Sequence, residues 1–300
     1  MKFAGIIAEY DPFHNGHAWQ LAQAKALGAE RVAVAMSCSL VQRGALPLLP
    51  EAVRTRSALT CGADLVFALP APCACAGAEA FARAGVALLA AAGCDGLVFG
   101  AETPDAALLM EAAELLDSDS YRAALKAQLA GGARSFAAAR QAAAAELASD
   151  ERVAALLDKP NNNLAVEYCR AIRSLAPRME AYPLPRQGAN HGEALHSAHG
   201  QFASASALRK LWAEGGADAV APYVPEAVFP LYQEAYAAGQ YTDFSAAGRC
   251  ELALLRSACR GKAPFADIRG VSEGLEHRLE AAVRTSTTYD ELLDALTTCL

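Results

Sequence analysis

Two histidines near the start of the chain have the types and spacing needed to hold a triphosphate. They lie in the tetrad His14-Asn15-Gly16-His17, just after the apolar run at residues 3–8. Two imidazoles one short turn apart can donate hydrogen bonds to the α-phosphate and bridging oxygen of ATP. Fixed donors at a phosphorus that gains charge in the transition state lower the barrier directly. Gly16 lacks the Cβ that would block backbone approach to the phosphates. The helix expected to begin at His17 points its positive end at them, so the tetrad predicts nucleotidylyl transfer.

The elements that must position the tetrad are visible in the first hundred residues, where short apolar runs alternate with alanine-rich stretches. Such alternation is typical of a parallel sheet covered on both faces. The predicted fold class is therefore α/β, with a Rossmann-like parallel sheet and helices on both faces. Ligands of such sheets bind beyond the carboxyl ends of the strands, where residues 10–17 would lie. The expected strands span residues 3–8, 31–36, 65–69 and 97–99, and the expected helices span 17–27, 50–61 and 78–92.

The rest of the chain reads as mostly helical. Residues 104–157 have a helical pattern, and the turn at 160–163 can cap a helix over 164–174. A further strand over 179–183, a polar loop over 187–201 and a helix from Ser204 are expected next. Gly215-Gly216 is the candidate boundary between a nucleotide-binding domain, residues 1–215, and a helical C-terminal region, residues 216–300.

Composition excludes several classes of protein. No apolar run reaches the roughly eighteen residues of a membrane span, and Met1-Lys2 leads straight into the first expected strand, so a cytoplasmic protein is expected. A net charge of −7 disfavours a protein that binds nucleic acid over its whole surface. The nine cysteines lack paired zinc spacing, and they read as reduced, small apolar residues.

The segment around the tetrad, Ala8-Glu9-Tyr10-Asp11-Pro12-Phe13-His14, resembles the opening of the tRNA(Met) cytidine acetate ligase family. That family belongs to the wider HxGH nucleotidylyltransferase superfamily. The resemblance continues in the family's order over most of residues 1–215. Its later blocks are Ala35-Met36-Ser37, Val41-Gln42-Arg43-Gly44, Gly62-Ala63-Asp64-Leu65-Val66, Leu69-Pro70, Ala78-Glu79, Phe99-Gly100-Ala101-Glu102, Asn161-Asn162, Glu167-Tyr168 and Ser204-Ala205-Ser206-Ala207-Leu208-Arg209-Lys210.

The resemblance implies a two-step reaction. Acetate would attack the α-phosphate of ATP to give acetyl-adenylate and pyrophosphate. The exocyclic amine of the wobble cytidine of elongator tRNA(Met) would then take the acetyl group, giving N4-acetylcytidine. A closed site would keep water from the mixed anhydride. Mg²⁺ is expected to be bound mainly through the phosphates, since it keeps most of its waters and needs no dedicated protein cage.

The resemblance also implies which residues contact ATP. His14 and His17 are the catalytic candidates. Asn162 is implied as an ATP contact, with the neighbouring Asn161 left open, and Asn162 can also act as a helix N-cap. Arg186 offers a planar cation suited to phosphate. The other implied ATP contacts are Ile7, Ala8, Glu9, Tyr10, Asn15, Gly16, Gln20 and Gly100.

Two further groups of residues are candidates. Ser204 and Ser206, with Arg209 one turn later, resemble the serine-rich phosphate motif of nucleotidylyltransferases. Hydroxyls and free amides at a helix start can hold the β- and γ-phosphates, although a plain capping box would look alike. Gln42 and Arg43 are candidates for the acetate or cytidine side, where the arginine could hold a carboxylate.

The sequence departs from the family at four places. Ala45 stands where an acidic residue is usual, and Ala68 stands where glutamate is usual. Glu51 replaces a lysine near the arginine matched to Arg54 and would oppose negative charge at the phosphates unless it points away. The strongly basic segment that follows the last helix in relatives is not present, which predicts weaker tRNA binding than ATP binding.

Two other functions remain open at this point. The same tetrad and serine motif would serve an adenylyltransferase acting on a small phosphorylated metabolite. Glu51 and the missing basic segment would also suit a nucleotide-binding homologue with weakened catalysis.

Overall fold

The main sheet has five parallel strands in the order β3-β2-β1-β4-β5, which confirms the predicted fold class. The computed structural model describes residues 1–42, 44–132, 135–186, 195–197, 200–260, 265–268, 271 and 274–297. The chain builds outward from β1 to β3 and then adds β4 and β5 on the other side of β1. The topological switch point, where open α/β sheets bind ligands, therefore lies between β1 and β4. The strands are β1 (Phe3–Ala8), β2 (Arg31–Ser37), β3 (Leu65–Leu69), β4 (Gly96–Ala101) and β5 (Glu180–Pro185).

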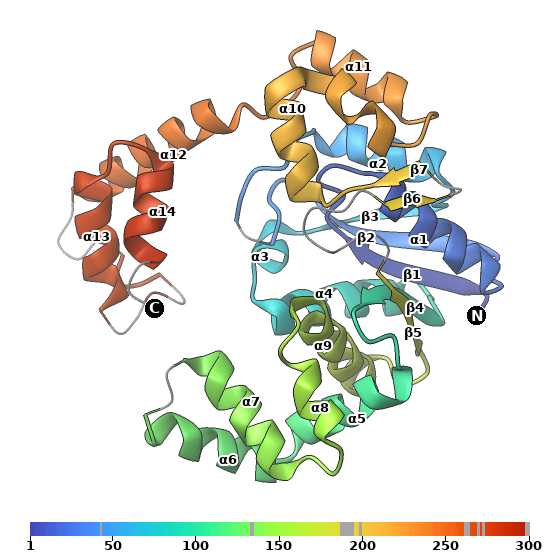
Figure 1. The fold of residues 1–300 in the computed structure, drawn as a ribbon, viewed down its shortest axis with the longest axis vertical. Helices are drawn as coiled ribbons and strands as arrows, with labels where there is room; N and C mark the ends of the chain where they lie inside the picture. The colour runs from blue at the N-terminus through green and yellow to red at the C-terminus, as the bar shows by residue number, and fades with distance from the viewer. Residues whose placement is uncertain are drawn as a thin grey trace. The chain divides into compact units, whose positions relative to one another are not determined.

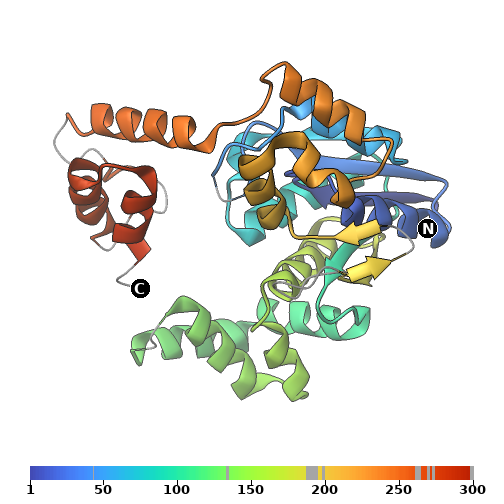
Figure 2. The same cartoon turned by 45° about the horizontal axis from the view of Figure 1, so that its top comes forward.

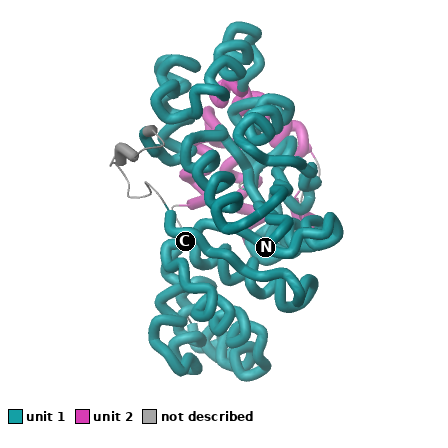
Figure 3. Tube along the Cα trace, turned by 90° about the vertical axis from the view of Figure 1, so that its right-hand side faces the viewer, with its two compact units in different colours: residues 1–241 teal, residues 242–300 magenta. Residues whose placement is uncertain are grey.

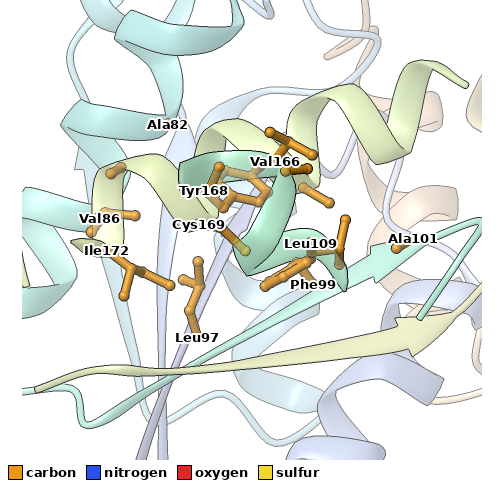
Figure 4. Close-up of a cluster of buried hydrophobic side chains, with 14 of the residues drawn as sticks. Ala82, Val86, Leu97, Phe99, Ala101, Leu109, Val166, Tyr168, Cys169 and Ile172 are labelled. Carbon is orange, nitrogen blue, oxygen red and sulfur yellow. The ribbon is translucent and has the colours of Figure 1, made fainter. Parts of the chain in front are cut away.

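Helices cover both faces of this sheet (Figures 1 and 2). Side chains alternate along β4, so Leu97 and Val98 belong to the cores on opposite faces. One face packs against α4 (Ala78–Ala91), α5 (Ala106–Asp117) and α9 (Pro160–Leu175), where Leu97 lies near Val86 and Ile172 (Figure 4). The other face packs against α1 (Asn15–Ala26), α2 (Glu51–Thr60), α10 (Ala205–Val220) and α11 (Phe229–Ala237).

The predicted helical region at 104–157 is confirmed. It holds α5, α6 (Asp119–Ala130), α7 (Phe136–Leu147) and α8 (Glu151–Leu156), and each of these helices begins after a side-chain cap. The caps are Asp105, Ser118, Ser135 and Asp150, residue types that accept the otherwise unpaired amides of a first turn. Helix α9 starts at Pro160, four residues before the predicted start, because proline suits the first helical position.

The polar loop predicted at 187–201 contains strand structure. Strands β6 (Leu195–Ser197) and β7 (Gly200–Phe202) pair in antiparallel fashion, and most of the remaining loop lies outside the described residues. Two short helical elements lie elsewhere in the chain. They are α3 (Ala71–Ala74), between β3 and α4, and the 3-10 helix η1 (Ala221–Tyr223), after α10.

The chain divides into two compact units, residues 1–241 and 242–300 (Figure 3). Helix α10 runs across the glycine pair at which the sequence placed a boundary. Gly216 adopts φ +65° within it, and a Cβ there would meet the Tyr236 ring at 2.5 Å. This glycine therefore permits a kink against α11, whose packing keeps residues 216–241 with the first unit.

The second unit has its own small core. Leu252, Val283 and Leu292 are buried together on α12 (Phe244–Ala258), α13 (Leu275–Thr285) and α14 (Tyr289–Thr297). Arg256 and Arg284 donate to main-chain carbonyls within this unit, so two of its cations serve its own fold. Across the described ranges, every helix is too short or too polar to cross a membrane.

Candidate active site

A cavity of about 360 Å³ lies beyond the carboxyl ends of β1, β4 and β5, which is a volume typical of small-molecule sites. The tetrad, the start of α9, the end of β5 and the start of α10 all contribute to its wall. Its lining residues are Ile7, Ala8, Glu9, Tyr10, Asp11, His14, Gly16, His17, Trp19, Gln20, Gln42, Phe81, Gly100, Asn161, Leu164, Tyr168, Leu184, Pro185, Arg186, Ala203, Ser204 and Ala205.

The two histidine rings stack in this cavity, with centroids 3.8 Å apart and planes inclined by 22°. His14 is the N-cap of α1, and its Nδ1 accepts the Gly16 amide at 3.0 Å. His17 lies in the first turn rather than at the helix start, and its Nδ1 accepts the His14 amide at 3.3 Å. Because both Nδ1 atoms accept, the neutral rings carry their protons on Nε2 and offer two N–H donors.

Gly16 is required by this packing. A Cβ at Gly16 would meet Cε1 of His14 at 2.9 Å, which is closer than real side-chain contacts allow. The glycine therefore makes room for the first imidazole.

Both imidazoles are held neutral near pH 7. Burial, and then the positive charge of Arg186, lower the pKa of His14 to about 4. Burial, the neighbouring His14 and Arg186 also lower the pKa of His17 well below 6.5. Neutral imidazoles keep the Nε2 donors without adding a cation, so the pair can act on an anion as hydrogen-bond donors rather than as acids.

These lowered pKa values predict that the protein loses stability as the pH falls from about 6.5 towards 4. In that window the unfolded chain binds protons on His14 and His17 that the folded protein does not bind, so the free energy of unfolding rises with pH. Urea unfolding of the His14→Asn variant at pH 7 and pH 5 is expected to show a smaller pH difference than the parent. The matched His277→Asn variant, in which a 78% exposed side chain is changed, is expected to keep the parental difference. Equal pH differences in all three proteins would contradict the prediction.

The turn before the tetrad is held by Asp11. Its buried carboxylate accepts the Leu48 amide at 2.6 Å and pairs with Arg209 at 3.0 Å. Arg209 also donates to the Asp11 carbonyl at 2.7 Å, and it does not line the cavity. The structure therefore places this predicted phosphate ligand behind the turn, where it fixes the loop that carries the histidines.

Tyr10 packs against the ring of the second histidine, His17. Its ring packs edge-on against His17 at 4.8 Å and against Phe13 at 4.9 Å, and its backbone has φ +51°. The Tyr10 hydroxyl is buried without a hydrogen-bond partner in the described structure. Burial raises its pKa far above the ordinary value of 10, so this residue acts through its ring.

Arg54 is fully buried behind the carboxyl ends of β1 and β2. It donates to the carbonyls of Leu49 at 3.0 Å, Glu9 at 2.7 Å and Ser37 at 2.6 Å, and also to that of Cys38. Glu51 does not line the cavity. The pKa of the Cys38 thiol is raised to about 11. Burial is the largest cause, and the negative charge of Glu51 is the next. The departure at Glu51 therefore places no negative charge at the histidines.

The start of α9 separates the two asparagines that the sequence left open. Asn162 is 1% exposed and pairs with Thr103, accepting its amide at 2.9 Å and donating to its hydroxyl at 3.1 Å. Asn161 lines the cavity instead, and its Oδ1 accepts a hydrogen bond from Arg186, which also lines the cavity. Of the two asparagines that the sequence left open, Asn161 is therefore the one that lines the cavity.

The start of α10 provides a second helix N-terminus at the cavity. Ser204 is its N-cap and accepts the Ala207 amide at 3.2 Å, while the Ser204 and Ser206 hydroxyls lie 3.2 Å apart. Ser204 and Ala205 line the cavity, but Ser206 does not. The unpaired first-turn amides and the helix dipole suit an anion here.

Most of the remaining predicted residues line the cavity, and Asn15 instead holds α1 in place behind it. Ile7, Ala8, Gly16, Gly100, Gln42 and Glu9 line the cavity, and the Glu9 carboxylate accepts the Gln42 amide at 2.6 Å. Gln20 also lines it while donating to the Val98 carbonyl at 3.1 Å. Asn15 is buried and ties α1 to the Gln201 and Pro222 carbonyls, so it supports the site from behind. Arg43 lies outside the described residues.

Sequence reasoning missed one wall of the cavity. Asn161, Leu164 and Tyr168 are spaced at i, i+3 and i+7 along α9, so they share one face of the helix, and that face lines the cavity together with Phe81. Helical spacing was the available signal. It could not say which face of α9 borders the cavity.

Tyr168 brings a hydroxyl to this wall. The residue is 4% exposed, and its ring packs on that of Phe99 with centroids 5.4 Å apart. The Tyr168→Phe variant removes only that hydroxyl, so it is expected to raise the KM of a bound substrate about fivefold with the fold intact. Separate titrations of nucleotide and acid substrate would measure the effect. Tyr182→Phe is the matched control, because that hydroxyl pairs with Glu180 outside the cavity. Unchanged KM values for both substrates in Tyr168→Phe would refute the prediction.

Comparisons with known proteins agree with the motifs. A family model described as HIGH Nucleotidyl Transferase matches residues 1–299. The tRNA(Met) cytidine acetate ligase of Syntrophotalea carbinolica is 37% identical over 299 residues, covering 99% of this chain and 70% of that protein. The protein of the same name from Acetivibrio thermocellus is 33% identical, covering 99% of this chain and 73% of its own length.

Two solved structures are similar to this chain over its whole length. The crystal structure of apo TmcAL from Thermotoga maritima matches with a TM-score of 0.91 at 30% identity, covering all of this chain and 72% of that one. TmcAL from the same organism bound with alpha-thio ATP matches with a TM-score of 0.89 at 29% identity, covering all of this chain and 71% of that one. With these matches across its whole length, the chain belongs to the tRNA(Met) cytidine acetate ligase family of HIGH nucleotidyl transferases.

Proposed function

We propose that this protein uses ATP, as its Mg²⁺ complex, to activate acetate as acetyl-adenylate and then transfers the acetyl group to the wobble cytidine of elongator tRNA(Met). The observation that carries the proposal is the stacked, neutral pair His14 and His17, whose Nε2 donors lie in a cavity flanked by two helix N-termini. The names of the matched relatives and the α-thio ATP held by the Thermotoga maritima protein support it. The cytoplasm, where tRNA is modified, is the proposed location.

In the first step, a carboxylate oxygen of acetate bonds to the α-phosphorus while the bond to the bridging oxygen breaks and pyrophosphate leaves. Negative charge grows on the α-phosphoryl and bridging oxygens. The imidazole Nε2–H groups are fixed donors for that charge, and the positive ends of the α1 and α10 dipoles lie beside them. Mg²⁺ bound through the phosphates and water would supply positive charge to the leaving pyrophosphate.

In the second step, the N4 amine of the cytidine attacks the acetyl carbonyl and AMP leaves, so the amine gives up one proton overall. The wall formed by Phe81, Leu164 and Tyr168 excludes water from one side of the cavity and favours aminolysis over hydrolysis of the mixed anhydride. Residues 1–215 are proposed to carry the nucleotide chemistry, and the helical remainder to contribute to tRNA binding.

The proposal is tested with the purified full chain, MgATP, radiolabelled acetate and an elongator tRNA(Met) transcript. Acetate-dependent exchange of pyrophosphate into ATP is expected without tRNA, and N4-acetylcytidine is expected only when tRNA is added. A transcript with uridine at the wobble position is the matched control and is expected to accept no acetyl group. Pyrophosphate release driven only by a phosphorylated metabolite, or ATP binding without any turnover, would overturn the proposal.

A further inference from the structure

We infer that Glu102, which lies outside the cavity, is a positioning residue that sets the orientation of the Asn161 amide and through it holds Arg186 at the nucleotide. The inference rests on the proposed function, since it assumes that Arg186 contacts the bound triphosphate. Glu102 is not a lining residue of the cavity, whereas Asn161 and Arg186 both are. Its influence on the reaction therefore passes through Asn161.

The carboxylate of Glu102 collects three donors at the start of α9. Its Oε1 accepts from the Asn161 side-chain amide at 2.6 Å and from the Asn161 backbone amide at 3.3 Å. Its Oε2 accepts from the Asn162 backbone amide at 2.7 Å. A carboxylate at a helix N-terminus is the favoured ligand for such amides. Although partial burial acts against it, these hydrogen bonds hold the pKa of Glu102 below its ordinary value.

The consequence is a fixed direction for the Asn161 side chain. An ionised carboxylate has no donor, so it can bind the side chain of Asn161 only through Nδ2. The carbonyl Oδ1 is thereby turned away from Glu102, and this oxygen accepts the hydrogen bond from Nη1 of Arg186. An amide turned the other way would present Nδ2 to a guanidinium that has only donors, and the hydrogen bond would be lost.

Arg186 in turn acts on the catalytic pair. Its positive charge is among the causes that lower the pKa of His14 and of His17, so it lies within electrostatic reach of both rings. Its stem also lies over Gly100, where a Cβ would meet the Arg186 Cγ at 3.4 Å. Two hydrogen bonds thus connect Glu102, in the turn after β4, through Asn161 to Arg186 at the cavity.

The experiment is a double-mutant cycle on the full chain that combines Glu102→Gln with Arg186→Met. The introduced amide at position 102 can donate to Asn161 Oδ1 and so turn it away from Arg186. Glu102→Gln alone is expected to raise the KM for ATP five- to tenfold in the acetate-dependent exchange assay, with kcat within twofold of the parent. In the Arg186→Met background the same change is expected to alter the KM for ATP less than twofold, because the guanidinium through which Glu102 acts is absent.

Asp105→Asn is the matched control. Asp105 follows Glu102 by three residues, caps the neighbouring helix α5 through the Leu108 amide at 3.1 Å and does not line the cavity. This variant is expected to leave the KM for ATP unchanged. If Glu102→Gln has the same effect in both backgrounds, or none in the parent, the inference fails while the proposed function stands. If Arg186→Met itself leaves the KM for ATP unchanged, the assignment of Arg186 to the nucleotide fails instead.

Discussion

The His14→Asn and His17→Ala variants are each expected to exchange pyrophosphate into ATP about 10² to 10³ times more slowly than the parent protein. This is the usual cost of removing one preorganised donor from a developing negative charge. Both rings offer Nε2–H to the cavity, and both are neutral, so each supplies a hydrogen bond. The rate of acetate-dependent exchange at saturating ATP measures the effect.

Asparagine is chosen at position 14 because it separates catalysis from folding. His14 is the N-cap of α1 and accepts the Gly16 amide. Asparagine is a favoured N-cap whose side-chain oxygen can replace Nδ1, but it places no donor where Nε2 lies. The variant is therefore expected to unfold at nearly the parental urea concentration at pH 7. His277→Asn, at an exposed position, is the control for the loss of a histidine and is expected to be fully active. Activity of His14→Asn within threefold of the parent would exclude a direct role for this imidazole.

The sheet and the placement of the tetrad were predictable because both depend on local sequence. Buried parallel strands need short apolar runs, and a functional turn after the first of them must lie at the carboxyl edge. The tetrad satisfies this, since it follows β1 after the turn at residues 9–13 and its first residue caps α1. The helix start was misplaced by two residues because histidine is an unusual N-cap, and nothing local shows that His14 accepts the Gly16 amide.

The residues whose positions the sequence could not show are those whose contacts depend on distant partners. Arg209 has the spacing of a phosphate ligand, but Asp11, 198 residues earlier in the chain, takes its guanidinium. Asn161 and Asn162 are neighbours of the same type, and only the packing of α9 against the turn at Thr103 decides which faces the cavity. Tyr168 belongs to a motif that the sequence shows. Its position in the cavity wall depends on how α9 packs against the sheet, which the sequence does not show.

Arg54 is the clearest case of a residue whose importance the sequence could not show, and its replacement is expected to have the largest effect on stability. Arg54→Met is expected to lower the free energy of unfolding of the first unit by about 3–5 kcal/mol, because it leaves several buried carbonyls without a donor. Three of these carbonyls, those of Glu9, Ser37 and Cys38, lie at or just after the ends of β1 and β2, and the fourth, that of Leu49, lies just before α2. Burial lowers the pKa of Arg54 below its ordinary value, but the nearby Asp11 raises it and helps to keep the guanidinium charged.

Urea unfolding followed by tryptophan fluorescence measures this loss, since both tryptophans, Trp19 and Trp212, lie in the first unit. Arg56→Met is the matched control, because its side chain is 58% exposed and pairs with Glu234 only at 3.6 Å. Such a surface pair contributes little, so a change of less than about 0.5 kcal/mol is expected. Arg54 also fixes the carbonyl of Glu9 at the rim of the cavity, so any folded Arg54→Met protein is expected to bind ATP more weakly. Parental stability of Arg54→Met would mean that water or neighbouring groups can replace the guanidinium, and the buried arginine would then have no structural role at the site.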